Sequence, residues 1–344
     1  MALRETDLNW FSNIDIEYMN KKAKSAIKLI LSLALAVILV WFSFKNIDWP
    51  QFWANLHCTR WSFVLLFCIC AILAIFIRAL RWHQMIKPLD PDIKLATIWD
   101  ANNIGNLTNT IIPGSGELIR CAVASKGGAQ YNAVLGTEIM ERAWDGLAIA
   151  ILVILSLVLG SESISDFFSQ HIWGPLTNNP HNVLWGTLVV LLVVVIVVLS
   201  RRLKNRYKLF SKIYEFFHGL FAGFSSFRNM QGKVLFLLYT ALLWGMYILM
   251  YLFVLKAVPA LSGLDITDAI LLAAIGNIAS VIPVPGGVGA YHYLIAMSLS
   301  SIYGINWELG ILFATLQHEL HAFLLIILGV ISYAHSSIRS DKNQ

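Results

Sequence analysis

The chain has 344 residues, of which 58% are hydrophobic and only 13% are charged, and its formal net charge is +5. Soluble globular domains carry about 25% charged residues, so this composition excludes an ordinary soluble domain and indicates a polytopic membrane protein. The basic residues gather in short patches beside hydrophobic runs. Such patches orient helices and meet anionic lipid headgroups, and we expect no nucleic-acid partner.

The pattern predicts an all-α fold with about eight hydrophobic segments in one transmembrane domain, residues 25–335, between a polar segment, 1–24, and a short tail, 336–344. Six segments are long enough to cross a bilayer. They are 25–44, 62–82, 131–158, 183–200, 233–256 and 308–333. Residues 209–230 mix aromatic and polar side chains, which predicts an amphipathic helix lying on the cytoplasmic surface.

Two further hydrophobic segments, 93–126 and 267–303, are interrupted by Pro-Gly sequences. The basic patch at 201–208 should face the cytoplasm, whereas the connections 160–182 and 257–268 contain no Lys or Arg and should be external. These assignments agree if each interrupted segment enters and leaves on the same face, as a re-entrant hairpin. We therefore expect a multi-pass membrane protein with both termini in the cytoplasm.

The interrupted segments resemble each other. The stretch IGNLTNTIIPGSG (104–116) aligns with IGNIASVIPVPGG (275–287) through Gly-Asn and Pro-Gly, and each lies between two spanning segments. With the topology above, units 62–158 and 233–333 form an inverted repeat, an arrangement in which many transporters bind substrate near the midplane. Chance similarity of apolar segments is the alternative. The predicted helix breaks are Pro113, Gly114, Gly116, Pro285, Gly286, Gly287 and Gly289.

The first interrupted segment is unusually polar. Asn102, Asn106 and Asn109 recur at helical spacing and can line a water-filled cavity, which is where irregular backbone is tolerated at membrane depth. A short helix should begin at Glu117, and its free N–H groups could receive an anion such as a phosphate. Arg120 lies one turn further on.

The segment 131–158 carries four ionisable residues on one helical face, namely Glu138, Glu141, Arg142 and Asp145. Charged groups inside a membrane are expensive and usually functional. A structural clamp, in which Arg142 pairs with Glu138 and Asp145, and a substrate or proton pathway are both open, and both can hold together. Two earlier arginines, Arg78 and Arg81, are interpreted as cytoplasmic anchors.

The last helix contains Gln317, His318 and His321 on one face, whereas Glu319 should point elsewhere. The spacing is not the HExxH of a zinc site, so we expect no metal, and His292 could join a protonatable lining instead. The sequence contains no nucleophile motif, P-loop or dinucleotide fingerprint, so we expect no cofactor and no enzymatic activity.

The chain resembles the lysylphosphatidylglycerol synthase transmembrane-region family, also called flippase-like or UPF0104 proteins. The resemblance rests on RALRW (78–82), the pattern Asn…Pro-Gly…Gly-Glu-x-x-Arg (106–120), Glu-Arg-x-x-Asp (141–145) and Pro-Gly-Gly-x-Gly (285–289). It implies a multi-pass protein of the bacterial cytoplasmic (inner) membrane that moves phosphatidylglycerol-type lipids between leaflets. Two departures are the AYHY sequence (290–293), where many relatives have a Glu, and the absence of the cytosolic aminoacyl transferase that some members carry, so we expect no aminoacylating enzyme.

We therefore expect a transporter of an anionic phospholipid or lipid-linked headgroup, with a small-ion or solute carrier and a non-transporting scaffold as alternatives. Membrane phospholipids are the expected partners, and a homo-oligomer and a separate lipid-modifying enzyme are left open. The residues expected to contact substrate are Asn106, Glu117, Arg120, Glu141, Arg142, Asp145, Asn277, His292, His318 and His321.

Overall fold

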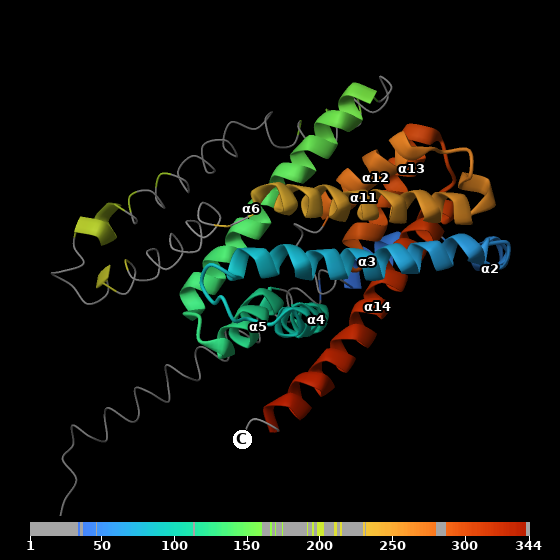
Figure 1. The fold of residues 1–344 in the computed structure, drawn as a ribbon. Helices are drawn as coiled ribbons and strands as arrows, with labels where there is room; N and C mark the ends of the chain where they lie inside the picture. The colour runs from blue at the N-terminus through green and yellow to red at the C-terminus, as the bar shows by residue number, and fades with distance from the viewer. Residues whose placement is uncertain are drawn as a thin grey trace, which may run out of the picture.

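The computed structural model describes residues 37–45, 47–112, 114–159, 232–279 and 287–341, together with isolated positions elsewhere. Within these residues every regular element is a helix and there is no strand (Figure 1), which confirms the all-α fold class. The predicted segment 1–24, most of the span 25–44, the span 183–200 and the surface helix 209–230 fall largely outside the described residues.

Four predicted spans are confirmed as long apolar helices. They are α3 (Trp61–Ile86), α6 (Tyr131–Leu159), α11 (Lys233–Ala257) and α14 (Trp307–Asp341). The shortest of the four has 25 residues. At about 1.5 Å per residue such a helix exceeds the roughly 30 Å hydrocarbon thickness of a bilayer. Large apolar side chains such as Leu65, Ile154 and Leu238 are exposed along these helices, as expected for surfaces that contact lipid.

Each interrupted segment consists of two helices. The first contains α4 (Leu95–Ile111) and α5 (Ser115–Ala124), and the second contains α12 (Ile266–Ala279) and α13 (Ala290–Tyr303). Short elements complete the described chain: α2 (Trp49–His57), η1 (Ser125–Gly127) and η3 (Pro259–Leu261). Three predicted break residues, Pro113, Pro285 and Gly286, lie outside the described residues.

The α4–α5 hairpin depends on glycine. Gly114 precedes α5 with φ 75°, a left-handed conformation that glycine adopts without strain, and α5 begins at Ser115, two residues before the predicted start. The two arms then cross at Gly105 and Gly116, where a Cβ on Gly116 would overlap the carbonyl oxygen of Gly105. In the second hairpin, Gly287 and Gly289 also have positive φ, 75° and 85°.

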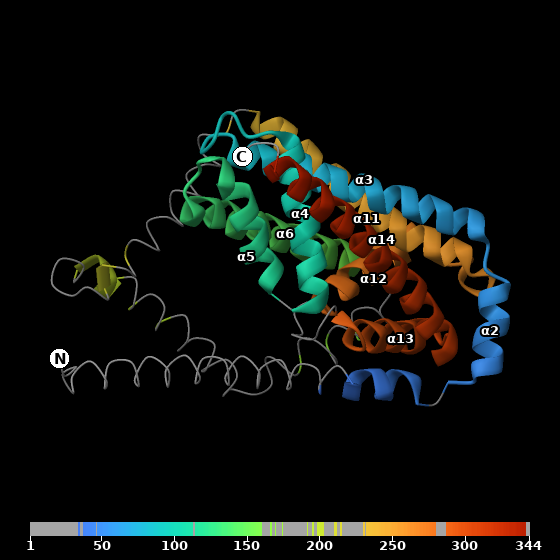
Figure 2. The same ribbon diagram turned by 90° about the horizontal axis from the view of Figure 1, so that it is seen from below.

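The helices pack in a reciprocal pattern (Figures 1 and 2). The first helices of the two units, α3 and α11, lie side by side, and the last helix of each unit packs on the first hairpin arm of the other, α6 on α12 and α14 on α4. Each last helix also contacts the second hairpin arm of its own unit, α6 with α5 and α14 with α13. The charged residues of α6 face α3 and α5 in this packing.

Candidate functional site

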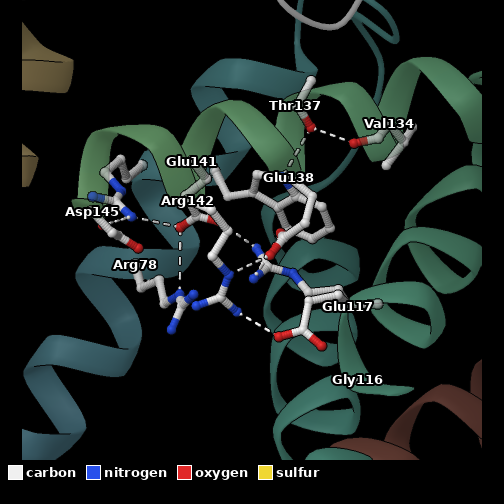
Figure 3. A network of polar contacts seen from close by, with 12 residues as sticks. Arg78, Gly116, Glu117, Val134, Thr137, Glu138, Glu141, Arg142 and Asp145 are labelled. Atoms are coloured by element: carbon white, nitrogen blue, oxygen red, sulfur yellow. Dashed lines mark hydrogen bonds and ion pairs between the residues drawn. The ribbon is translucent and has the colours of Figure 1, made fainter. Parts of the chain in front are cut away.

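Charged side chains from α3, α5 and α6 form one connected ion network (Figure 3). Among the described residues it joins four arginines to four carboxylates, so the formal charges cancel. The members are Arg78, Arg81, Arg120, Arg142, Glu117, Glu138, Glu141 and Asp145. The network satisfies the requirement that buried charges be paired, although some of its buried atoms, among them Nε and Nη1 of Arg81 and Nε of Arg120, have no hydrogen-bond partner among the described residues.

Glu141 is the centre of the network. Its fully buried carboxylate accepts from Nη2 of Arg81 at 2.8 Å and from Nη2 of Arg120 at 2.7 Å, and it lies 3.4 Å from Nε of Arg78. Arg81 also pairs with Asp145 at 2.7 Å. One carboxylate therefore ties α3 and α5 to α6, and the prediction that the stripe on α6 includes a structural clamp agrees with this geometry.

The interpretation of Arg78 and Arg81 as cytoplasmic anchors is wrong. The side chain of Arg81 is 0% exposed and that of Arg78 is 17% exposed, and both residues pair with Glu141 inside the bundle. The sequence held a signal for this arrangement, because the stripe on α6 has three carboxylates and one arginine and needs further cations inside the bundle.

Arg120 belongs to α5, and its side chain is buried against α6. Its Nη1 is 2.9 Å from Oε2 of Glu138, and its guanidinium carbon is 3.9 Å from the ring centroid of Trp82, close enough for a cation–π contact. The indole N–H of Trp82 donates to Oγ1 of Thr137 at 3.0 Å, which fixes the ring. Both terminal nitrogens of Arg120 therefore already face carboxylates. The expected contact of Arg120 with a phosphate would require these pairs to open, and it stays a prediction.

Arg142 is the most exposed of the four arginines in the network, and Figure 3 shows its side chain reaching toward Glu117. Its Nη2 donates to Glu117 at 2.8 Å and its Nε donates to Glu138 at 3.1 Å, while 46% of its side chain remains exposed. The predicted pairing with Glu138 is confirmed. The predicted pairing with Asp145 is wrong, because Asp145 faces Arg81 and the hairpin residue Glu117 takes its place beside Arg142.

One of the free N–H groups at the start of α5 already has a side-chain partner. Oδ1 of Asn109 accepts from the backbone N–H of Gly116 at 2.7 Å, and Nδ2 of Asn109 donates to Glu117 at 3.2 Å. Asn109 therefore serves the hairpin itself, and an anion at this helix end would have to displace it. Asn102 is buried, and Asn106 is half-buried on α4.

A cavity of about 340 Å³ lies beside the network, at mid-depth of the spanning helices, since Gly146, Tyr247 and His321 line it near the middle of their apolar stretches. Its polar wall is formed by Arg78, Arg142, Asp145, Asn277, Gln317, His318 and His321. Its apolar and aromatic wall includes Ile149, Trp244, Tyr247, Met250, Tyr251 and Tyr291. Five residues predicted to contact substrate thus meet in one cavity: Arg142, Asp145, Asn277, His318 and His321.

The far wall of the cavity is built by the second hairpin and α14. The prediction that Gln317, His318 and His321 share a face is confirmed, and within the described residues Oε1 of Gln317 is buried without a hydrogen-bond partner. Tyr291 and Tyr251 share a hydrogen bond of 3.0 Å beside Gly276, where a Cβ would overlap the Tyr251 hydroxyl. His292 is buried against His318, with ring centroids 5.5 Å apart.

A family model described as the lysylphosphatidylglycerol synthase TM region matches residues 29–329, while no curated protein and no solved structure matches the chain. The matched range contains the whole ion network and every residue that lines the cavity. Since the match covers most of the chain, this membrane protein belongs to the lysylphosphatidylglycerol synthase TM-region family.

Proposed function

We propose that the protein is a lipid transporter that moves an anionic phospholipid or a lipid-linked headgroup between the leaflets of the bacterial cytoplasmic membrane. The observation that carries this proposal is the cavity at mid-depth, which combines an accessible arginine, Arg142, with polar groups from the second hairpin and α14. Its volume of about 340 Å³ lies within the range of small-molecule sites and can hold a headgroup.

The reciprocal helix packing supports an inverted repeat for this function. One wall of the cavity comes from α6 of the first unit and the other from α12 and α14 of the second. Transporters built from inverted repeats bind substrate at such an interface, next to broken helices. In this proposal the two hairpins re-enter from opposite faces, both termini lie in the cytoplasm, and the acyl chains remain in the bilayer.

Arg142 is the proposed contact for the headgroup phosphate. Its guanidinium faces the cavity and is only partly enclosed, and a guanidinium can bind a phosphate through two parallel hydrogen bonds. Its present partner Glu117 belongs to the α4–α5 hairpin, so an arriving phosphate would replace one anion by another at Arg142, while Glu117, whose side chain is 28% exposed, would keep its hydrogen bond from Asn109. This exchange would release the hairpin and couple substrate binding to movement of α5.

The balanced ion network also favours a second candidate, a membrane scaffold without transport, because the buried charges are paired with one another. The cavity argues for transport, since a scaffold has no need for a polar space at mid-depth. For either candidate we propose no catalytic role for the chain; any modification of the lipid would belong to a separate enzyme.

The test is leaflet-resolved transport by the purified protein in liposomes, with fluorescent phosphatidylglycerol and phosphatidylcholine compared. We expect faster movement of the anionic lipid than in protein-free liposomes, and a loss of at least about tenfold in Arg142→Gln, since a hydrogen bond to a charged group contributes about 1.5–3 kcal/mol. Arg60→Gln, at the exposed start of α3, is the matched control and should transport normally. Equal rates with and without protein would support the scaffold.

A further inference from the structure

We propose that His292, His318 and Glu319 form a binding site for a first-row divalent transition metal ion of the Zn²⁺ class. The two histidines and the glutamate come from α13 and α14, and their nearest ligand atoms all lie within 4.8 Å of one another. This site goes beyond the proposed transport function and does not depend on it. It departs from the prediction of no metal, which rested on spacing within the last helix alone.

The distances suit such an ion. Nδ1 of His318 lies 3.0 Å from Oε1 of Glu319, and Nε2 of His292 lies 3.7 Å from the same oxygen. With bonds of about 2.0–2.2 Å, the ligand atoms of a tetrahedral Zn²⁺ site are separated by roughly 3.4 Å, between these two values. Glu319 was expected to point away from the histidines, and its position beside both is therefore a correction.

The buried histidine is the second observation that points to a ligand. His292 is 1% exposed, its Nδ1 has no hydrogen-bond partner among the described residues, and its Nε2 is too far from Glu319 for a hydrogen bond. The unpaired Nδ1 is not the nitrogen that faces Glu319. The 3.7 Å approach to Glu319 is instead the one polar contact of Nε2 among the described residues, whereas the polar groups of a buried side chain are normally hydrogen-bonded. A metal ion between His292 and Glu319 would bond to Nε2 and give this ring a function.

Two imidazoles and one carboxylate are a donor set that Zn²⁺ and neighbouring divalent ions accept, with a fourth position left for water or another oxygen. His318 also lines the cavity, so this open position would lie at the edge of the proposed substrate space. Gly287 packs close to the other side of the ring, where an added Cβ would be 3.4 Å from Nε2 of His318, which leaves Nδ1 as the nitrogen directed at Glu319.

The experiment uses the full chain in detergent, purified without a histidine tag and with no lipid substrate added. Binding of Zn²⁺ is measured by titration calorimetry, and bound Co²⁺ is followed by its visible absorption, which reports the coordination geometry. We expect one ion per chain with a four- or five-coordinate Co²⁺ spectrum. Glu319→Gln, whose side chain is half-exposed, is the first variant, because it should fold without the metal.

Loss of a direct ligand should weaken Zn²⁺ binding by at least about tenfold, since even removal of outer partners of a metal ligand costs 10–100-fold. His318→Gln should do the same, and His57→Gln, at an exposed position on α2, should bind as the unaltered protein does. Unchanged melting of the metal-free variants would show that they fold. The proposal is overturned if the protein takes up no ion, or if Glu319→Gln and His318→Gln bind Zn²⁺ as tightly as His57→Gln.

Discussion

Replacing Glu141 by Gln should destabilise the bundle strongly. The substitution keeps the shape of the side chain but removes the negative charge that faces Arg81 and Arg120 at 2.8 and 2.7 Å, and Arg78 at 3.4 Å. Three guanidiniums would then be left with fewer carboxylates at a position that is fully buried. Breaking a buried ion pair from one side typically costs about 3–5 kcal/mol, and we expect a loss in this range.

The assay is thermal unfolding of the purified protein in detergent, followed by the fluorescence of its tryptophans, of which the chain has 12. A loss of about 3–5 kcal/mol should lower the melting temperature by roughly 5 °C or more. The matched control is Glu308→Gln in the first turn of α14, a carboxylate that forms no ion pair with the described residues and should change little.

A double variant separates charge imbalance from a general effect of mutation. Arg81→Gln removes one of the cations that Glu141→Gln leaves uncompensated, so the two changes together should cost less than the sum of the single changes. If Glu141→Gln melts at the temperature of Glu308→Gln, or if the two changes are additive, then the network does not hold α3, α5 and α6 together and our reasoning about it fails.

Two further predictions concern the hairpins. Gly116→Ala should lower the free energy of unfolding by about 1–3 kcal/mol, because its Cβ would overlap the arm of α4. The control, Gly245→Ala, has open space around the added Cβ and should not destabilise the protein. Thermal melting in detergent compares the two variants, and equal stability would contradict the close crossing of α4 and α5. The second prediction uses a Cys58→Ser background, because Cys58 is exposed. Impermeant thiol reagents should label Lys126→Cys from the cytoplasm and Asn306→Cys from outside, since both positions are exposed. Labelling of both cysteines from the same side would contradict the inverted repeat.

The spans and the hairpins could be predicted from the sequence because their signals are local. A long apolar run must cross the bilayer as a helix, since no water is present to satisfy the backbone, and Pro-Gly sequences interrupt such a helix. Four helices, α3, α6, α11 and α14, begin within one residue of their predicted first residues. The helices α3 and α14 continue past their predicted ends, because polar residues can remain helical beyond the apolar run.

The partners within the site could be predicted only in part, because they depend on which helices meet. Periodicity placed Glu138, Glu141, Arg142 and Asp145 on one face of α6, and this grouping agrees with the structure. Periodicity could not show that α3 supplies Arg81 to this group. A charge count for α6, with three carboxylates and one arginine, indicates only that further cations are needed. Long-range pairs of this kind carry no signal in local spacing.

The equal numbers of arginines and carboxylates in the network also matter for the proposed transport. A bundle that kept an unpaired arginine at mid-depth would be destabilised whenever substrate was absent, since uncompensated buried charge is costly. Pairing Arg142 with Glu117 removes this problem and still leaves the guanidinium partly exposed beside the cavity. In the proposed function, Arg81 and Arg120 remain bound to Glu141 and keep the helices together, while only the outer pair exchanges its anion. The same cluster can therefore act as both clamp and binding site because the two roles fall on different arginines.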